Sequence, residues 1–340
     1  MDITIDKLTE TQKQIAIQRL TALWAFLECG LGGMLHAFQM PFTGLVVGGL
    51  AIIIITLIAY FSDCSFKTLF KSMIIVLIIK VTISPYTPFP AYIAVTFQSL
   101  LGAGLFKLFR VNYFSVFLLS ILSMIESAIQ KIIVLTIFFG QSIWKAVDAF
   151  SKFVASLFHH KGFDGILYLI VIYFAIYIIG GIIVALLAIK TVRGIFNTNE
   201  RYILSAEITN STDLLKRTSK KKRIYSLMII MCLISATLLI FNKEKTNPFG
   251  TIINVFCWTF TAIIIWYYIL TPLFTKFILA LLKNKKNKYS NEVASVLYSL
   301  PELKSITQAA WTKSKDETGF KRLSVFLHYL INWSLTYTEK

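Results

Sequence analysis

The run ECGLGGMLHAFQMP at residues 28–41 opens a stretch that ends at Arg110 and includes PYTPFP at 85–90 and QSLLGAG at 98–104. The residues between these runs are mostly apolar, so the stretch is membrane-soluble in composition. It nevertheless holds ionisable side chains and many glycines. An ionisable residue in a spanning helix costs about 2.5–3.5 kcal/mol on insertion scales, so it usually faces protein, water or a bound solute. We therefore expect the functional site in this stretch.

The composition is that of a polytopic membrane protein. Of 340 residues, 56% are hydrophobic and only 15% are charged, whereas soluble domains carry about 25% charged residues. The net charge of +17 could suggest a nucleic-acid partner. However, Lys and Arg collect at the ends of apolar segments and in two loops, as membrane insertion requires. We predict a lipid membrane and no nucleic acid as the partner of these charges.

Spanning segments need about 20 apolar residues, and only helices satisfy their backbone hydrogen bonds within lipid. We therefore predict an all-α fold with about eight transmembrane helices. The expected segments are residues 20–38, 41–61, 69–85, 89–109, 113–138, 165–189, 225–241 and 250–281. The polar N-terminus lacks a signal-peptide pattern, so the first segment is expected to stay in the protein.

Lys and Arg residues lie at alternate ends of these segments, which places both termini in the cytoplasm and the proline turn at 85–90 outside. A bacterial cytoplasmic membrane is the expected location. The pattern divides the chain into four parts. They are a six-helix membrane core at 1–190, a basic cytoplasmic loop at 191–224, a two-helix membrane extension at 225–281 and a basic helical cytoplasmic tail at 282–340.

Two amphipathic stretches lie outside the expected spans. Apolar residues recur every three or four positions in 141–164, which predicts a helix on the membrane surface or a lid. The tail repeats this pattern through Leu323, Phe326, Leu330 and Trp333. It suggests a small helical pair packed on the membrane or on a partner.

Glu28 and His36 are the first candidate site residues. They lie eight positions apart on the first segment, an angular offset of about 80° on an α-helix, so both could face one solute cavity. Alternatively, His36 lies at the outer interface, and Glu28 is neutral and hydrogen-bonded to a neighbouring helix.

Four further polar residues lie in expected spans. Lys80 is near the outer end of its segment, where a lysine can snorkel to the headgroups; the alternative is a functional role. Gln98 must find hydrogen-bond partners, either on another helix or in a ligand. Glu126 and Gln130 lie one turn apart on one face, and they either contribute to solute binding or belong to a structural cluster in which Lys131 neutralises Glu126.

Ala25, Cys29 and Gly33 are spaced by four residues. Their small side chains predict a groove on the first helix that another helix approaches closely, either within the chain or in another subunit. The glycine pairs Gly48-Gly49 and Gly180-Gly181 predict similar close packing rather than nucleotide loops.

No P-loop or dinucleotide fingerprint occurs, so we expect no enzyme activity, no cofactor and no metal site. The four cysteines show no CxxC spacing. An intramembrane enzyme is a third possibility, and His159-His160 near Asp164 is the cluster that would serve it. Adjacent residues on a surface helix do not easily face one metal ion.

The glycine-rich turn with His36 and Pro41, the proline turn, and Gln98-x-x-x-Gly102 together resemble the substrate-binding membrane subunits of energy-coupling factor transporters. The resemblance covers about residues 20–190, which would supply the six helices usual in that family. It implies capture of a vitamin or metal from the outer side. Ala25, Cys29 and Gly33 would then dock to a transmembrane coupling subunit, with ATPase subunits supplying energy. The chain lacks the N-terminal chelating histidine of the nickel/cobalt type.

The leading hypothesis is therefore a transport subunit that captures a small solute in an intramembrane cavity. The alternative is a non-catalytic membrane scaffold or assembly protein that acts through its basic cytoplasmic regions.

Overall fold

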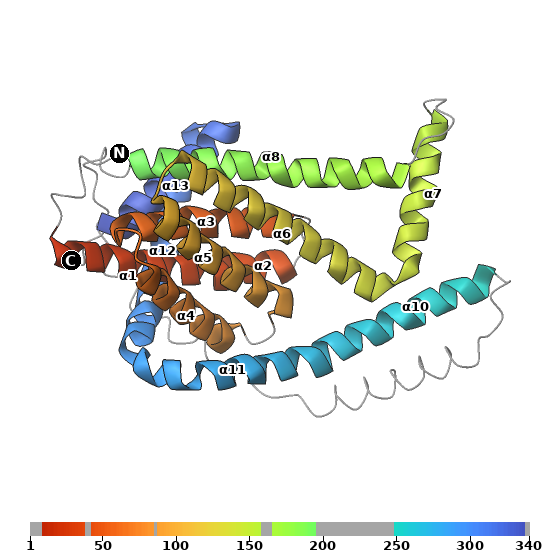
Figure 1. The fold of residues 1–340 in the computed structure, drawn as a ribbon, viewed down its shortest axis with the longest axis horizontal. Coiled ribbons are helices and arrows are strands. Elements are labelled where there is room, and N and C mark those ends of the chain that lie inside the picture. The colour runs from red at the N-terminus through yellow and green to blue at the C-terminus, as the bar shows by residue number, and fades with distance from the viewer. Residues whose placement is uncertain (1–8, 38–41, 85–86, 158–164, 195–247, 337–340) are drawn as a thin grey trace. The chain divides into compact units, whose positions relative to one another are not determined.

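The computed structural model describes residues 9–37, 42–84, 87–157, 165–194 and 248–336, and every regular element in these ranges is helical (Figure 1). The all-α prediction is confirmed for this part of the chain. The helices are α1 (Glu10–Phe26), the π-helical segment η2 (Leu27–Leu31), α2 (Gly32–Ala37), α3 (Thr43–Phe61), α4 (Phe66–Ile83), α5 (Phe89–Phe109), α6 (Tyr113–Phe139), α7 (Gln141–Leu157), α8 (Gly165–Gly194), α10 (Pro248–Ile264), the π-helical segment η5 (Ile265–Leu270), α11 (Thr271–Lys288), α12 (Ser290–Lys313), the 3₁₀ turn η6 (Ser314–Asp316) and α13 (Gly319–Thr336).

The chain forms two compact units. Unit 1 comprises residues 1–127, 177–212 and 277–340, and unit 2 comprises residues 128–176 and 213–276. Within unit 2, the Phe138 ring meets the Trp266 ring edge-on at a centroid distance of 5.3 Å, which joins α6 to η5. The candidate site residues other than Gln130 belong to unit 1. The four-part division of the sequence stays a prediction.

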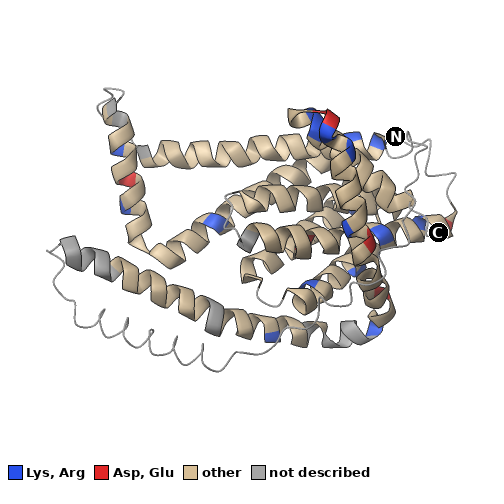
Figure 2. Ribbon diagram, turned by 180° about the vertical axis from the view of Figure 1, so that it is seen from behind, with Lys and Arg blue, Asp and Glu red and all other residues tan. Residues whose placement is uncertain are grey.

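Among the described residues, four helices are long and apolar enough to cross a membrane. They are α3, α5, α6 and α8, which coincide with the predicted segments 41–61, 89–109, 113–138 and 165–189. The prediction of a membrane protein is thus supported. Figure 2 shows α8 without charge along almost its whole length.

The other predicted spans do not reach this standard. The predicted segments 20–38, 69–85 and 250–281 are helical but are not among those four helices. The α4 helix carries three lysines in 18 residues, and η2 and η5 interrupt the other two. Segment 225–241 lies outside the described residues. Eight spans therefore stay a prediction.

The α3 helix forms the centre of unit 1 because it has no polar face. Its run from Ala51 to Ala59 is buried throughout, with Ile52, Ile55 and Ile58 fully covered. A helix that is apolar all round is stable only when other helices surround it. Figure 1 shows α3 lying among the other helices of unit 1.

Glycines let these helices approach closely. A Cβ added at Gly102 would lie 2.8 Å from Ile55 Cγ2, and one at Gly180 would lie 2.6 Å from Leu45 Cδ1. At Gly181 the nearest atoms are backbone, with Ile121 Cα at 3.2 Å. The glycine pairs therefore serve helix packing, as predicted. Gly104 differs, because nothing lies within 4 Å of its added Cβ.

Polar contacts join the basic ends of the helices at one end of unit 1. They link α1 to the α3–α4 loop, α4 to α12, α8 to α13 and α8 to α6. The pairs are Lys13 with Asp63 at 3.2 Å, Lys71 with Glu292 at 2.7 Å, Lys190 with Ser324 at 2.9 Å, and Arg193 above the Tyr113 ring at 4.9 Å. The cytoplasmic location of this end stays a prediction.

We predict that Gly181→Val destabilises the protein strongly, because its new methyl groups meet the α6 backbone, which cannot move aside as a side chain can. Overpacking of this kind costs about 1–3 kcal/mol. The measurement is the apparent melting temperature in detergent. The control Gly104→Ala should leave that temperature unchanged or raise it, since alanine favours the helix and has room. Equal losses in both variants would contradict the packing role.

A second prediction concerns Glu292, whose pKa lies below its ordinary value of 4.5 because of the Lys71 hydrogen bond. The bond therefore stabilises the protein above that value, and the contribution disappears as the pH falls through the lowered pKa. Glu292→Gln should lower the melting temperature slightly at neutral pH. The loss in unfolding free energy should be less than about 1 kcal/mol, because both side chains are partly exposed.

The gap between wild type and Glu292→Gln should close on acidification. Glu302→Gln on the same helix is the control, since Glu302 forms no ion pair among the described residues. A gap that persists or widens in acid would show that the Lys71 contact does not stabilise the α4–α12 junction.

Candidate functional site

Glu28 lies on a π-helical turn. The α-helical hydrogen bonding of α1 ends at Phe26, and the segment from Leu27 to Leu31 is π-helical before α2 resumes at Gly32. Gly30 and Gly32 weaken the preference for α geometry here, because glycine gains little from a regular helix. Isolated π turns are rare and occur frequently at functional sites. The turn sets the direction of Glu28, which is only 6% exposed.

Glu28 forms a buried ion pair with Lys80 of α4. Lys80 Nζ lies 2.6 Å from Glu28 Oε2, and both side chains are almost fully enclosed. Nζ also donates to the Ala91 carbonyl at 3.4 Å and lies 5.8 Å from the centroid of the Tyr92 ring. Three segments, η2, α4 and the start of α5, therefore meet at one ammonium group.

Such a pair constrains how these segments pack. Removing a charge from water costs several kcal/mol, and mutual attraction compensates only when the geometry is good. If η2 rotated, both charges would stay buried without partners. The pair therefore fixes the rotation of η2 against α4 and the start of α5.

The prediction that Lys80 snorkels to the headgroups is wrong. Lys80 is 2% exposed, because a carboxylate within the protein offers its ammonium a closer partner than the membrane surface does. The alternative for Glu28, a neutral carboxyl hydrogen-bonded to a neighbouring helix, is met in part: Glu28 does bond to a neighbouring helix, but in an ion pair with Lys80. A sequence signal was present, since Glu28 is the single charged residue of the predicted segment 20–38 and the predicted segment 69–85 carries only lysines, Lys71 and Lys80.

Gln98 lies deeper along α5. Its side chain is 1% exposed, and its Nε2 has no hydrogen-bond partner among the described residues. Gly48 on α3 makes room for the amide, because a Cβ there would lie 2.8 Å from Nε2. Gln98 is seven residues after Ala91, so it lies on the same face of α5, about 10 Å from the ion pair along the helix. Its amide is a free donor at the α3–α5 contact.

Three further residues were predicted to bind the solute: His36, Glu126 and Gln130. His36 belongs to α2, but its side chain lies outside the described residues. The angular argument linking it to Glu28 assumed an uninterrupted α-helix, and η2 breaks that register. Glu126 and Gln130 lie one turn apart on α6, in unit 1 and unit 2 respectively. Their part in solute binding stays a prediction.

The small-residue groove is not continuous. Ala25 is fully buried, so the helix that packs on it belongs to this chain. Cys29 lies on the π turn between Ala25 and Gly33. Residues four positions apart share a face only on an α-helix, so the three side chains do not line one groove. Docking of a coupling subunit at Cys29 and Gly33 stays a prediction, whereas Ala25 is not available for it.

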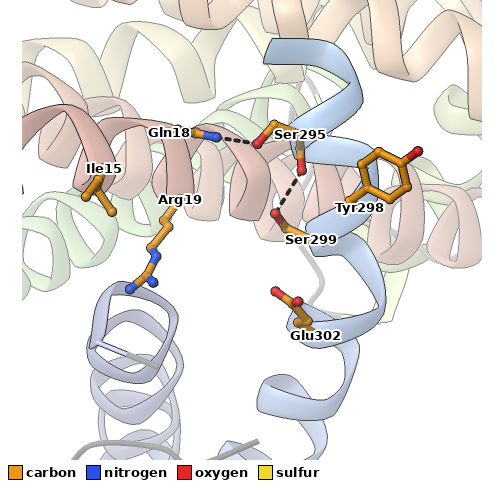
Figure 3. Close-up of a pocket in the computed structure, with 7 residues that line it drawn as sticks. All are labelled: Ile15, Gln18, Arg19, Ser295, Tyr298, Ser299 and Glu302. Atoms are coloured by element: carbon orange, nitrogen blue, oxygen red, sulfur yellow. Dashed lines mark hydrogen bonds between the residues drawn. The ribbon is translucent and has the colours of Figure 1, made fainter. Parts of the chain in front are cut away.

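A second polar feature lies between α1 and α12, where a groove of about 410 Å³ opens (Figure 3). Gln18 donates to Ser295, and Arg19 donates to the Leu335 carbonyl near the end of α13. Sequence patterns gave no sign of this groove, because its two sides come from distant parts of the chain. Its lining residues are Ile15, Gln18, Arg19, Ser295, Tyr298, Ser299 and Glu302.

Within the described residues, no three His, Cys, Asp or Glu side chains gather as metal ligands would. His159, His160 and Asp164, the cluster of the enzyme hypothesis, lie outside those residues. No known protein family, curated protein or solved structure matches the chain.

A double-mutant cycle tests the ion pair. Glu28→Leu and Lys80→Met should each cost about 3–5 kcal/mol, because each leaves one buried charge unpaired. The double variant should recover most of that loss, since two apolar side chains bury well there. Thr21→Val is the control, because it removes a buried hydrogen bond to Ser72 that joins the preceding helix, α1, to the same α4. Stabilities come from thermal unfolding in detergent, and a double variant as unstable as the sum of the singles would disprove the coupling.

Proposed function

We propose that the chain is a membrane transport subunit that captures a small polar solute within its helical core. The observation that carries this proposal is the enclosed Glu28–Lys80 pair on a π-helical turn. Ionisable residues inside membrane proteins are expensive, and they are retained mainly where they bind or move a solute or an ion.

The pair offers both signs of charge to a solute. A carboxylate or phosphate group would compete with Glu28 for Lys80, and a cationic group would compete with Lys80 for Glu28. In either case the solute replaces a contact instead of creating an unpaired charge, so its entry need not leave an uncompensated ion in the core. The π turn is the element that would adjust when Glu28 is displaced.

Gln98 adds a second recognition point. Its Nε2 donor is enclosed and has no partner within the described residues, and leaving such a group unsatisfied costs about 1–3 kcal/mol. A solute with an acceptor oxygen that reached the α3–α5 contact would recover that energy. Glu28, Lys80 and Gln98 together suit a solute with a charged group and a separate carbonyl or hydroxyl.

The finer features of the proposal come from charge patterning and from the resemblance to energy-coupling factor subunits. In this proposal the chain has eight spans, both termini face the cytoplasm, and the proline turn covers the outer entrance to the site. Partner subunits in a bacterial cytoplasmic membrane supply the energy.

A scaffold role for the tail is the second candidate. It is favoured by the way α12 and α13 attach to the membrane helices, through Lys71 with Glu292 and Lys190 with Ser324. A tail fixed to the core in this way could transmit contacts with other proteins. The same attachment means that deleting the tail would also disturb the core, so surface substitutions are the cleaner test of this role.

The decisive experiment is a thermal-shift screen of the purified full chain against a metabolite pool. A solute that binds the native state raises the melting temperature, and the stabilisation grows with the logarithm of its concentration relative to its dissociation constant. We expect a shift for wild type and for Thr21→Val, a smaller one for Gln98→Leu, and none for the Glu28→Leu/Lys80→Met double variant. An undiminished shift in the double variant would place binding elsewhere. No shift for any solute, combined with normal cellular function of the double variant, would favour the scaffold role.

A further inference from the structure

Exposed apolar side chains gather where α12 passes into α13. Trp311 is 49% exposed, Phe320 57% and Leu323 42%, and we call these three residues the tail patch. The Trp311 ring packs edge-on against Phe326 at a centroid distance of 5.4 Å, so its position is fixed. Exposed aromatic residues held in one place are characteristic of surfaces that contact something apolar.

Cations surround the tail patch. The Arg322 guanidinium lies 4.3 Å from the centroid of the Trp311 ring, and Lys321 pairs with Glu317 at 2.9 Å. Lysines at 313 and 315 are exposed, and Asp316 is the other acid of the turn. Figure 2 shows these blue and red bands together at the turn. Cations therefore outnumber anions around the patch.

Contacts with α8 show where the tail patch lies relative to a spanning helix. Lys190 donates to Ser324, and a Cβ at Gly194 would lie 3.7 Å from His328 Nδ1. The contact four residues further along α8 is also four residues further along α13, so α13 runs beside the end of α8 in the same direction. Phe320, one turn before Ser324, is therefore level with Leu186, an exposed apolar residue of α8.

The same end of unit 1 carries further exposed aromatic residues. Tyr113 lies beneath Arg193, and Phe109 and Phe114 meet edge-on at 5.4 Å. Aromatic residues of this kind form belts at the level of lipid headgroups, with Lys and Arg beside them.

We propose that the tail patch inserts into the headgroup layer of the membrane leaflet at this end, and that its cations bind anionic phospholipids. Interfacial helices combine an apolar face with Lys and Arg, and anionic lipids strengthen their binding. The positive charge fits phosphatidylglycerol better than a zwitterionic lipid. The proposal does not depend on solute capture.

The test uses the full chain in lipid nanodiscs of phosphatidylcholine, with or without one third phosphatidylglycerol. Leu323→Trp adds a fluorophore at the tail patch, and Tyr298→Trp adds one at an exposed position in the α1–α12 groove as the control. Lipids brominated near the headgroup should quench most of the fluorescence added by Leu323→Trp. Aqueous acrylamide should instead quench that added by Tyr298→Trp. If Leu323→Trp does not fold, the native Trp311 signal, obtained by subtracting Trp311→Phe, serves the same purpose.

Anionic lipid should strengthen the quenching by brominated lipid, and Lys313→Glu/Lys315→Glu should abolish that increase. Lys304→Glu, an exposed lysine earlier on α12, should leave the increase intact. Acrylamide quenching of the Leu323→Trp signal equal to that of the control would overturn insertion and leave a protein partner as the occupant. Equal quenching by brominated lipid in both lipid mixtures would overturn the anionic-lipid assignment.

Discussion

The enclosed contact between Lys80 and Glu28 is the interaction on which the arrangement of unit 1 depends. Neither residue could be placed in this apolar core alone, so η2, α4 and the start of α5 must meet where the two charges neutralise each other. Apolar packing between helices is non-directional and permits many rotations, whereas the ion pair forms only when its two side chains face each other. It selects one rotation of η2 from the many that its apolar surface would permit.

The helices with long uninterrupted apolar runs were the part of the fold that could be predicted well from the sequence. The helices α3, α5, α6 and α8 follow from uninterrupted apolar runs, and the glycine contacts follow from the need of such helices to approach closely. Segments broken by charge were less predictable. The α4 helix reads as a span except for its lysines, and one of those lysines belongs to the core.

The site itself was only half predictable. Glu28 and Gln98 stood out because each is polar in an apolar run, but their partners depend on tertiary packing. The π turn has no reliable sequence signal, and it invalidates the angular relation drawn between Glu28 and His36 and the repeat of Ala25, Cys29 and Gly33. One additional residue in a helical turn changes which side chains share a face, so periodicity arguments hold only up to such a turn.

The two ends of unit 1 use charge in opposite ways. Around Lys80, one cation is enclosed with one anion, and the structure gains a specific geometry. Around the α12–α13 turn, cations are exposed beside aromatic rings, and they are available to an external partner. The α8–α13 contact between Lys190 and Ser324 does not involve η2, so a rearrangement of η2 could leave that contact in place. Two helices connect the buried pair with the tail. The α1 helix continues into η2 and contacts α12 and α13 through Gln18 and Arg19, and α4 carries both Lys80 and Lys71. A change at the buried pair would therefore reach the tail through α1 and α4.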